Sequence, residues 1–178
     1  GKCLGEFDDT GFVRNTEQSA ADWTTLLHGK SPGFDYYRER FRTKGLYENV
    51  VYDGVFEMLE ALKKGGKEII LATSKPEPFA REILRYFGIA EYFDFVGAAT
   101  LDGRIGTKTE VLRHVIGSIS ASPEKCVLVG DRMHDIIGAH EVGMKCIAVL
   151  VGFGSLEEFS EYGADYVAET LANVLDYI

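Results

Sequence analysis

Two carboxylates four residues apart follow a short apolar run in the last third of the sequence. Residues 126–135 read CVLVGDRMHD, so the run ends at Gly130, and Asp131 and Asp135 come next. A continuous, mostly β-branched run is typical of a strand buried on both faces, and open α/β sheets bind ligands at the carboxyl ends of such strands. The two carboxylates therefore suit a hard cation such as Mg²⁺, which prefers oxygen ligands. They could equally cap the helix that follows, and this segment alone leaves both interpretations open.

Helical and strand patterns alternate from Tyr52 to the end of the sequence. Helices are expected at 54–64, from Pro76 to Gly88, at 108–119, from Asp135 to Gly143, at 155–162 and over the last ten residues. Strands are expected at 68–72, 93–96, 126–129, 146–150 and 165–167. This alternation predicts a doubly wound, mostly parallel α/β sheet with right-handed crossovers and helices on both faces.

Composition and charge narrow the class of protein. A chain of 178 residues fits one domain with at most a small appendage. The net charge of −9, with no run among the 19 Lys and Arg residues, argues against nucleic acid and favours a small partner. Three cysteines, Cys3, Cys126 and Cys146, suit thiols in a reducing compartment. The sequence has no apolar run near ~18 residues and no signal-peptide pattern, so we expect a cytoplasmic protein away from membranes. We expect it to be a monomer or a homodimer.

Three further segments are expected at the carboxyl ends of strands, where a parallel sheet would bring them together. They read FDDTG at 7–11, TSKP at 73–76 and GTK at 106–108. Together with Gly130-Asp131 and Asp135, and in this order, they resemble the four motifs of the haloacid dehalogenase-like superfamily. Residues 36–178 look similar almost throughout to its phosphoglycolate phosphatase-like members.

The resemblance implies a Mg²⁺-dependent phosphatase that acts on a small phosphorylated metabolite, with phosphoglycolate as the family-level substrate. A phosphate monoester dianion repels nucleophiles, so its hydrolysis needs a metal, cations and a positioned nucleophile. By resemblance, Asp8 would attack phosphorus and become an aspartyl-phosphate. Mg²⁺ would be held by Asp8, the backbone carbonyl of Thr10 and Asp131.

The same resemblance assigns the phosphate-binding residues. Thr73 and Lys108 would bind the phosphoryl oxygens, and Ser74 would add a backbone or hydroxyl contact. Asp135 would orient the metal shell or Lys108. Lys75 is expected to be a surface neighbour rather than a second phosphate ligand, since lysines are mostly exposed.

The first motif departs from the pattern of the superfamily's phosphatases, which read Asp-x-Asp-Gly-Thr. Thr10 stands where their second Asp serves as the general acid. Either Thr10 occupies the acid position and the nucleophile works without acid help, or a one-residue shift makes Asp9 the acid. The departure also favours a second hypothesis, a non-catalytic module of this fold that binds phosphate and metal or has a regulatory role.

The sequence also departs in length from the resembling proteins, which carry a helical cap domain after the first motif. Here only residues 12–35 stand between that motif and a charged helix expected at 36–44, too few for a helical bundle. We therefore divide the chain into an α/β core, residues 1–11 and 51–178, and a shortened cap remnant, residues 12–50. Either the cap is truncated or the sequence omits part of it.

Overall fold

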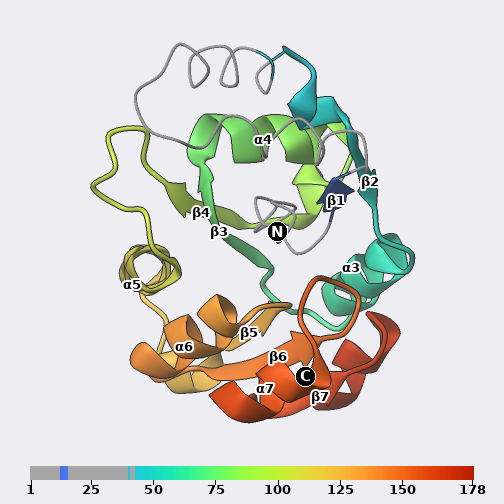
Figure 1. Ribbon diagram of the computed structural model, residues 1–178, viewed down its shortest axis with the longest axis vertical. Coiled ribbons are helices and arrows are strands. Elements are labelled where there is room, and N and C mark those ends of the chain that lie inside the picture. Colours follow the sequence, from blue (N-terminus) through green and yellow to red (C-terminus); the bar gives the residue numbers. More distant parts are fainter. Residues whose placement is uncertain (1–12, 16–39, 41–42) are drawn as a thin grey trace.

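The computed structural model describes residues 13–15, 40 and 43–178 (Figure 1). The strands are β1 (Val13–Asn15), β2 (Asn49–Val51), β3 (Ile70–Pro76), β4 (Phe95–Ala99), β5 (Val127–Gly130), β6 (Lys145–Val149) and β7 (Tyr166–Ala168). The α-helices are α3 (Val55–Lys64), α4 (Glu77–Tyr86), α5 (Lys108–Ile119), α6 (Met133–Glu141) and α7 (Leu156–Tyr162). Short 3-10 helices are η1 (Gly45–Tyr47), η2 (Ala90–Tyr92), η3 (Pro123–Lys125) and η4 (Ala172–Tyr177).

The predicted α/β class with parallel strands is confirmed. β3 pairs with β4 in parallel, and β6 pairs in parallel with β5 on one side and β7 on the other. β1 and β2 form a separate antiparallel pair, which the sequence pattern did not predict. Helix α5 begins and ends at the residues predicted for it, whereas the helix predicted over the last ten residues is the shorter 3-10 helix η4, Ala172–Tyr177.

Strand β6 shows why the core has two sides. Its buried side chains alternate, with Ile147 and Val149 in one apolar cluster and Cys146 and Ala148 in another. The first cluster lies with α3 and α4, and the second with α5, α6 and α7. Because successive strand side chains point to opposite faces, β6 is buried by helices on both faces, as expected for a doubly wound sheet.

The cysteines of the described part of the chain are free thiols. Cys146 is fully buried and Cys126 is partly buried. Burial raises the pKa of the Cys146 thiol to about 12, so this group stays protonated at neutral pH. Cys3 lies outside the described residues. None of the helices in the described ranges is long and apolar enough to cross a membrane.

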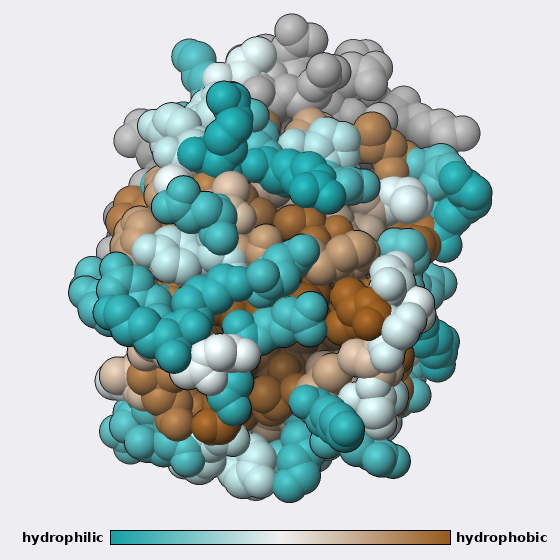
Figure 2. All heavy atoms as spheres, turned by 180° about the vertical axis from the view of Figure 1, so that it is seen from behind, coloured by the Kyte–Doolittle hydropathy of each residue, from teal (hydrophilic) through white to brown (hydrophobic). Residues whose placement is uncertain are grey.

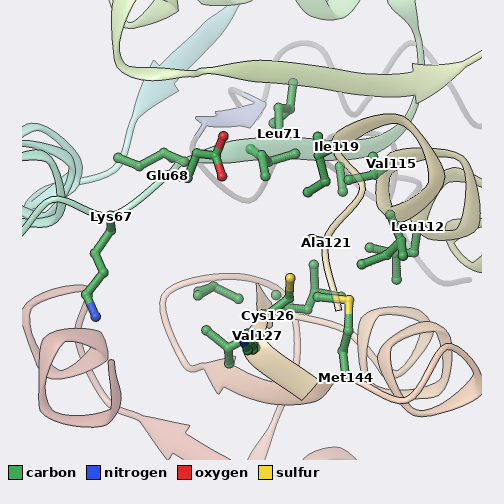
Figure 3. Close-up of a pocket in the computed structure, with 18 of the residues that line it drawn as sticks. Lys67, Glu68, Leu71, Leu112, Val115, Ile119, Ala121, Cys126, Val127 and Met144 are labelled. Carbon is green, nitrogen blue, oxygen red and sulfur yellow. The ribbon is translucent and has the colours of Figure 1, made fainter. Parts of the chain in front are cut away.

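A slot separates β3 from β5. Each strand pairs with a neighbour along one edge, and the described residues form no ladder with its other edge. A cavity of about 670 Å³ lies between them, with Leu71 of β3 above, Val127 of β5 below and Leu112 of α5 at the side (Figure 3). Apolar side chains also gather across the middle of the rear face of the molecule (Figure 2).

Gly97 gives a test of the packing that holds α5 on the sheet. A Cβ at this position of β4 would overlap a methyl group of Val115, which is buried on α5. We expect Gly97→Ala to lower the free energy of unfolding by about 1–3 kcal/mol, because an overpacked core must shift side chains or backbone. Urea unfolding measures this change.

The matched control for Gly97→Ala is Gly117→Ala on α5. A Cβ at Gly117 meets open space, and alanine in a helix interior is favoured over glycine by roughly 0.5–1 kcal/mol. The control should therefore be neutral or stabilising. Equal effects of the two substitutions would contradict the close approach of β4 and α5.

Candidate active site

Helix α5 begins at Lys108 because of a complete capping box. The Thr107 hydroxyl accepts the backbone N–H of Glu110 at 3.2 Å, and the Glu110 carboxylate accepts the N–H groups of Thr107 and Gly106 at 2.9 Å. These bonds satisfy N–H groups that the first helical turn leaves without partners. Lys108 is thereby fixed as the first residue of the helix.

The Lys108 ammonium connects strand β3 with helix α6. Its Nζ lies 2.9 Å from Asp135 Oδ1 on α6, and it donates a hydrogen bond of 2.9 Å to the carbonyl of Ala72 on β3. The side chains of Lys108 and Asp135 are only 6% and 9% exposed, so this ion pair is buried. Gly138 of α6 leaves the room that the Lys108 stem occupies, since a Cβ there would crowd Lys108 Cγ.

Asp135 also organises the loop that carries the other carboxylate. Its Oδ2 accepts the backbone N–H groups of Asp131 at 3.1 Å and of Arg132 at 3.2 Å. Gly130 is required here, because a Cβ would overlap the Asp135 carboxyl group. One carboxylate therefore both caps the start of α6 and orients Lys108.

Asp131 is buried, and its carboxylate faces a second loop. Its Oδ2 accepts the N–H of Phe153 at 2.8 Å, and a side chain at Gly152 would overlap the carboxylate. Burial raises the pKa of Asp131 to about 6, and the neighbouring Asp135 adds to the increase. The Phe153 hydrogen bond and the charges of Lys108 and Arg132 oppose it.

The second half of β3 contains a β-bulge. Pairing with β4 shifts between Thr73 and Pro76, which removes Ser74 and Lys75 from the ladder. Thr73 is fully buried, and its hydroxyl accepts the N–H of Lys75 at 3.1 Å. The expectation that Lys75 lies on the surface is wrong: it is only 7% exposed, because it lies on the same face of β3 as the buried residues Leu71 and Thr73. Ser74 is half-buried.

One carboxylate of the described residues has the chemistry that the expected metal site requires. Asp131 offers a buried carboxylate whose Oδ1 receives no hydrogen bond from the described part of the chain. Such an oxygen fits a hard cation, and a cation would offset the cost of burying the charge. No group of three His, Cys, Asp or Glu side chains converges on one point within the described ranges. The other expected ligands, Asp8 and Thr10, lie outside the described residues.

Sequence reasoning missed two contributors to this site. Phe153 acts through its backbone N–H, which no side-chain pattern can reveal. Glu158 of α7 accepts the N–H of Met133 at 2.6 Å and a hydrogen bond from Arg132 Nε at 3.2 Å. Its sequence signal, Ser155 followed three residues later by Glu, indicates a local helix cap rather than a contact with α6.

Comparison with known proteins identifies the family. Residues 8–143 match the haloacid dehalogenase-like hydrolase family, and the chain belongs to it. A predicted phosphatase from Clostridium acetobutylicum has a similar structure, with a TM-score of 0.81 and 34% identity, over 92% of this chain and 77% of that chain. The expected superfamily and fold are thus confirmed.

Two curated relatives are similar over most of this chain. A 5'-nucleotidase of Pseudomonas aeruginosa is 45% identical over 138 residues, 78% of this chain and 62% of its own length. A phosphoglycolate phosphatase of Vibrio vulnificus is 30% identical over 129 residues, 72% of this chain and 56% of its own length. The chain therefore spans less than two thirds of either relative.

The buried ion pair predicts a large effect of Lys108→Met on stability. Removing the ammonium leaves the Asp135 carboxylate buried without its cation, which costs about 3–5 kcal/mol in comparable buried pairs. Urea unfolding at neutral pH measures the loss. The control is Lys64→Met, since the Lys64 side chain is 78% exposed and pairs with Glu60 on the surface, which is worth under about 0.5 kcal/mol. A Lys108→Met protein as stable as this control would contradict the buried pair.

The raised pKa of Asp131 predicts a pH dependence of stability in metal-free protein. Between the ordinary aspartate value of 3.8 and about 6, the native state holds a proton that the unfolded state releases. The contribution of Asp131 to the free energy of unfolding therefore falls as pH rises through this window. Asp131→Asn keeps an oxygen for the Phe153 N–H and removes the charge. At pH 7.5 it should raise the free energy of unfolding by roughly 1–3 kcal/mol, at 1.36 kcal/mol per pKa unit.

At pH 4 the gain from Asp131→Asn should nearly vanish, because the carboxyl group is then protonated in the native state. Denaturant unfolding in the presence of a chelator measures both values. Asp53→Asn, at an exposed position, serves as the control and should change stability little at either pH. A gain from Asp131→Asn that is the same at pH 4 and pH 7.5 would rule out the raised pKa.

Proposed function

We propose that this chain is a Mg²⁺-dependent phosphatase that hydrolyses a small phosphate monoester through an aspartyl-phosphate intermediate. The observation that carries the proposal is the buried arrangement of Asp131, Asp135 and Lys108 at the carboxyl ends of β3 and β5. Burying a charge is costly unless it is paired with another charge or with a ligand. Carboxylates with a shifted pKa are therefore candidates for functional residues. Membership of a hydrolase family and the two relatives, one named a 5'-nucleotidase and the other a phosphoglycolate phosphatase, support the same activity.

The slot between β3 and β5 supports a position for the nucleophile. Its walls are strand edges that the described residues leave without a partner on that side, and its end is lined by Asp131, Asp135 and Lys108. The proposed role of Asp8, which lies outside the described residues, requires its carboxylate to reach the end of the slot that Asp131 lines.

Each of the proposed site residues would have a separate role in the reaction. Asp8 would attack phosphorus, the bond to the leaving oxygen would break, and water would then hydrolyse the aspartyl-phosphate. Lys108 would bind the phosphoryl oxygens with Thr73 and Ser74, and the pairing with Asp135 keeps the ammonium in place beforehand. Bound Mg²⁺, held by Asp8, the carbonyl of residue 10 and Asp131, would supply charge neutralisation.

The comparisons suggest two substrate types for the proposed activity. One similar relative is a 5'-nucleotidase and the other is a phosphoglycolate phosphatase, so the substrates shared by these names are small phosphate monoesters. We place phosphoglycolate and nucleoside 5'-monophosphates together in the panel to be tested.

The proposal predicts metal-dependent turnover of p-nitrophenyl phosphate and of the alkyl esters in the panel. A chelator should abolish activity and Mg²⁺ should restore it, because the phosphoryl charge is otherwise not neutralised. Asp131→Asn should raise the Mg²⁺ concentration needed for half-maximal turnover, whereas Asp53→Asn should leave that concentration unchanged. Turnover that is equal in metal-free and Mg²⁺-loaded protein would refute the metal dependence.

The same assay separates the two arrangements of the first motif. A general acid contributes about 10² to 10⁴ in rate for a poor leaving group, and an aryl phosphate needs little such help. If Thr10 stands at the acid position, p-nitrophenyl phosphate is cleaved, alkyl esters are cleaved poorly, and Thr10→Asp improves the alkyl esters. If Asp9 is the acid, alkyl turnover is good and is lost in Asp9→Asn. Binding of phosphate and Mg²⁺ without cleavage of any ester would instead identify a non-catalytic module.

A further inference from the structure

Two segments of this chain share one capping signature and use it differently. Thr107 and Glu110 form the complete box at α5, in which the glutamate turns back to the N–H of its own cap residue. Ser155 and Glu158 have the same spacing at α7, and the Ser155 hydroxyl accepts the N–H of Glu158 at 3.2 Å. The Glu158 carboxylate, however, does not return to Ser155. It reaches across to another helix.

Glu158 binds the loop that holds Asp131 and the start of α6. Its Oε1 accepts the backbone N–H of Met133 at 2.6 Å and a hydrogen bond from Arg132 Nε at 3.2 Å. The Arg132 and Glu158 side chains are 23% and 20% exposed, so the contact is largely shielded from water. A carboxylate bound to a guanidinium and a backbone N–H makes charge-assisted hydrogen bonds, which are stronger than neutral ones.

Three consecutive backbone N–H groups after Gly130 are thus held by two carboxylates from different elements. Asp135 of α6 accepts those of Asp131 and Arg132, and Glu158 of α7 accepts that of Met133. The loop before α7 adds contacts from the same side, since the Phe153 N–H binds Asp131 and a side chain at Gly154 would overlap the Asp131 carbonyl. The backbone position of Asp131 therefore depends on the segment 152–158.

We propose that Glu158 is a positioning residue for the metal-binding carboxylate Asp131. It acts through the backbone of Met133 and the side chain of Arg132, and it touches neither the metal nor the substrate. This inference rests on the proposed function, because it assumes that Asp131 is a metal ligand. Groups that orient metal ligands from behind typically affect metal affinity by 10-fold to 100-fold.

The experiment separates position from charge at residue 158. Glu158→Gln keeps an oxygen at the same reach for the Met133 N–H and removes the charge. Glu158→Asp keeps the charge and withdraws the carboxylate by one methylene. We expect the Kd for Mg²⁺, measured by titration calorimetry of the full chain, to rise about 10-fold or more in Glu158→Asp and Glu158→Ala. In Glu158→Gln it should rise only a few-fold.

Glu161→Ala and Glu161→Gln are the matched controls. Glu161 is an exposed residue of the same helix, and these substitutions remove the same charge as the corresponding substitutions of Glu158. Both should leave the Kd for Mg²⁺ unchanged. Hydrogen exchange at the Met133 amide gives a second measurement that does not depend on metal. It should be slow in the natural protein and Glu158→Gln, and faster in Glu158→Asp and Glu158→Ala.

Each outcome decides the proposal. If the Kd for Mg²⁺ is unchanged in Glu158→Asp and rises strongly in Glu158→Gln, the charge of Glu158 attracts the cation and the positioning role is wrong. An unchanged Kd in all folded Glu158 variants would overturn the inference and leave the proposed function standing. If Glu158→Ala fails to fold, the Gln and Asp variants still decide. Absence of Mg²⁺ binding by the natural protein would overturn both the inference and the metal dependence of the proposed function.

Discussion

The structure depends on one buried ion pair, between Lys108 of α5 and Asp135 of α6. Removing two charges from water is costly, and the attraction between them compensates only when the remaining hydrogen-bonding capacity is also used. Here it is used on both sides. Lys108 also donates to the carbonyl of Ala72, and Asp135 also accepts two backbone N–H groups from the loop after β5. The pair therefore fixes β3, α5 and α6 relative to one another at the edge where strands end.

Close packing of glycines against the charged groups makes this arrangement specific. Side chains at Gly130, Gly138 and Gly152 would meet Asp135, Lys108 and Asp131 respectively. Without a Cβ, each of these positions lets a charged side chain lie directly against backbone, where water is excluded and hydrogen bonds are strengthened. The same exclusion raises the pKa of Asp131, which makes a cation at this carboxylate favourable.

Much of this arrangement could be predicted from the sequence, because it depends on local patterns. The helical pattern at 108–119 predicted the bounds of α5, and the continuous apolar run at 146–150 predicted the buried strand β6. The order of polar residues after strands predicted which loops approach each other, since parallel strands end at one edge. Lys108, Asp131 and Asp135 line that edge in the structure, and Thr73 is buried in β3.

The remainder depended on contacts between distant segments. Lys75 is buried because β3 continues to Pro76 and Lys75 lies on the face that also buries Leu71 and Thr73, whereas the strand predicted from the sequence ended at residue 72. Glu158 follows a capping signature but binds α6, because the loop of Met133 and Arg132 lies within its reach. The final helix, predicted over the last ten residues, covers only Ala172–Tyr177 and is a 3-10 helix. Asp8 and Thr10, which the resemblance places at the centre of the chemistry, lie outside the described residues.

The central claim is that Asp8 and Asp131 meet at one metal ion beside Lys108. The most direct measurement is a crystal structure of the full chain with Mg²⁺ and beryllium trifluoride, which binds a carboxylate and stands in for the phosphoryl group of an aspartyl-phosphate. The account predicts beryllium bonded to Asp8, a fluorine within hydrogen-bonding distance of Lys108 Nζ, and Mg²⁺ bound by Asp8 and Asp131. Mg²⁺ bound away from Asp131, or beryllium bonded to a residue other than Asp8, would contradict it.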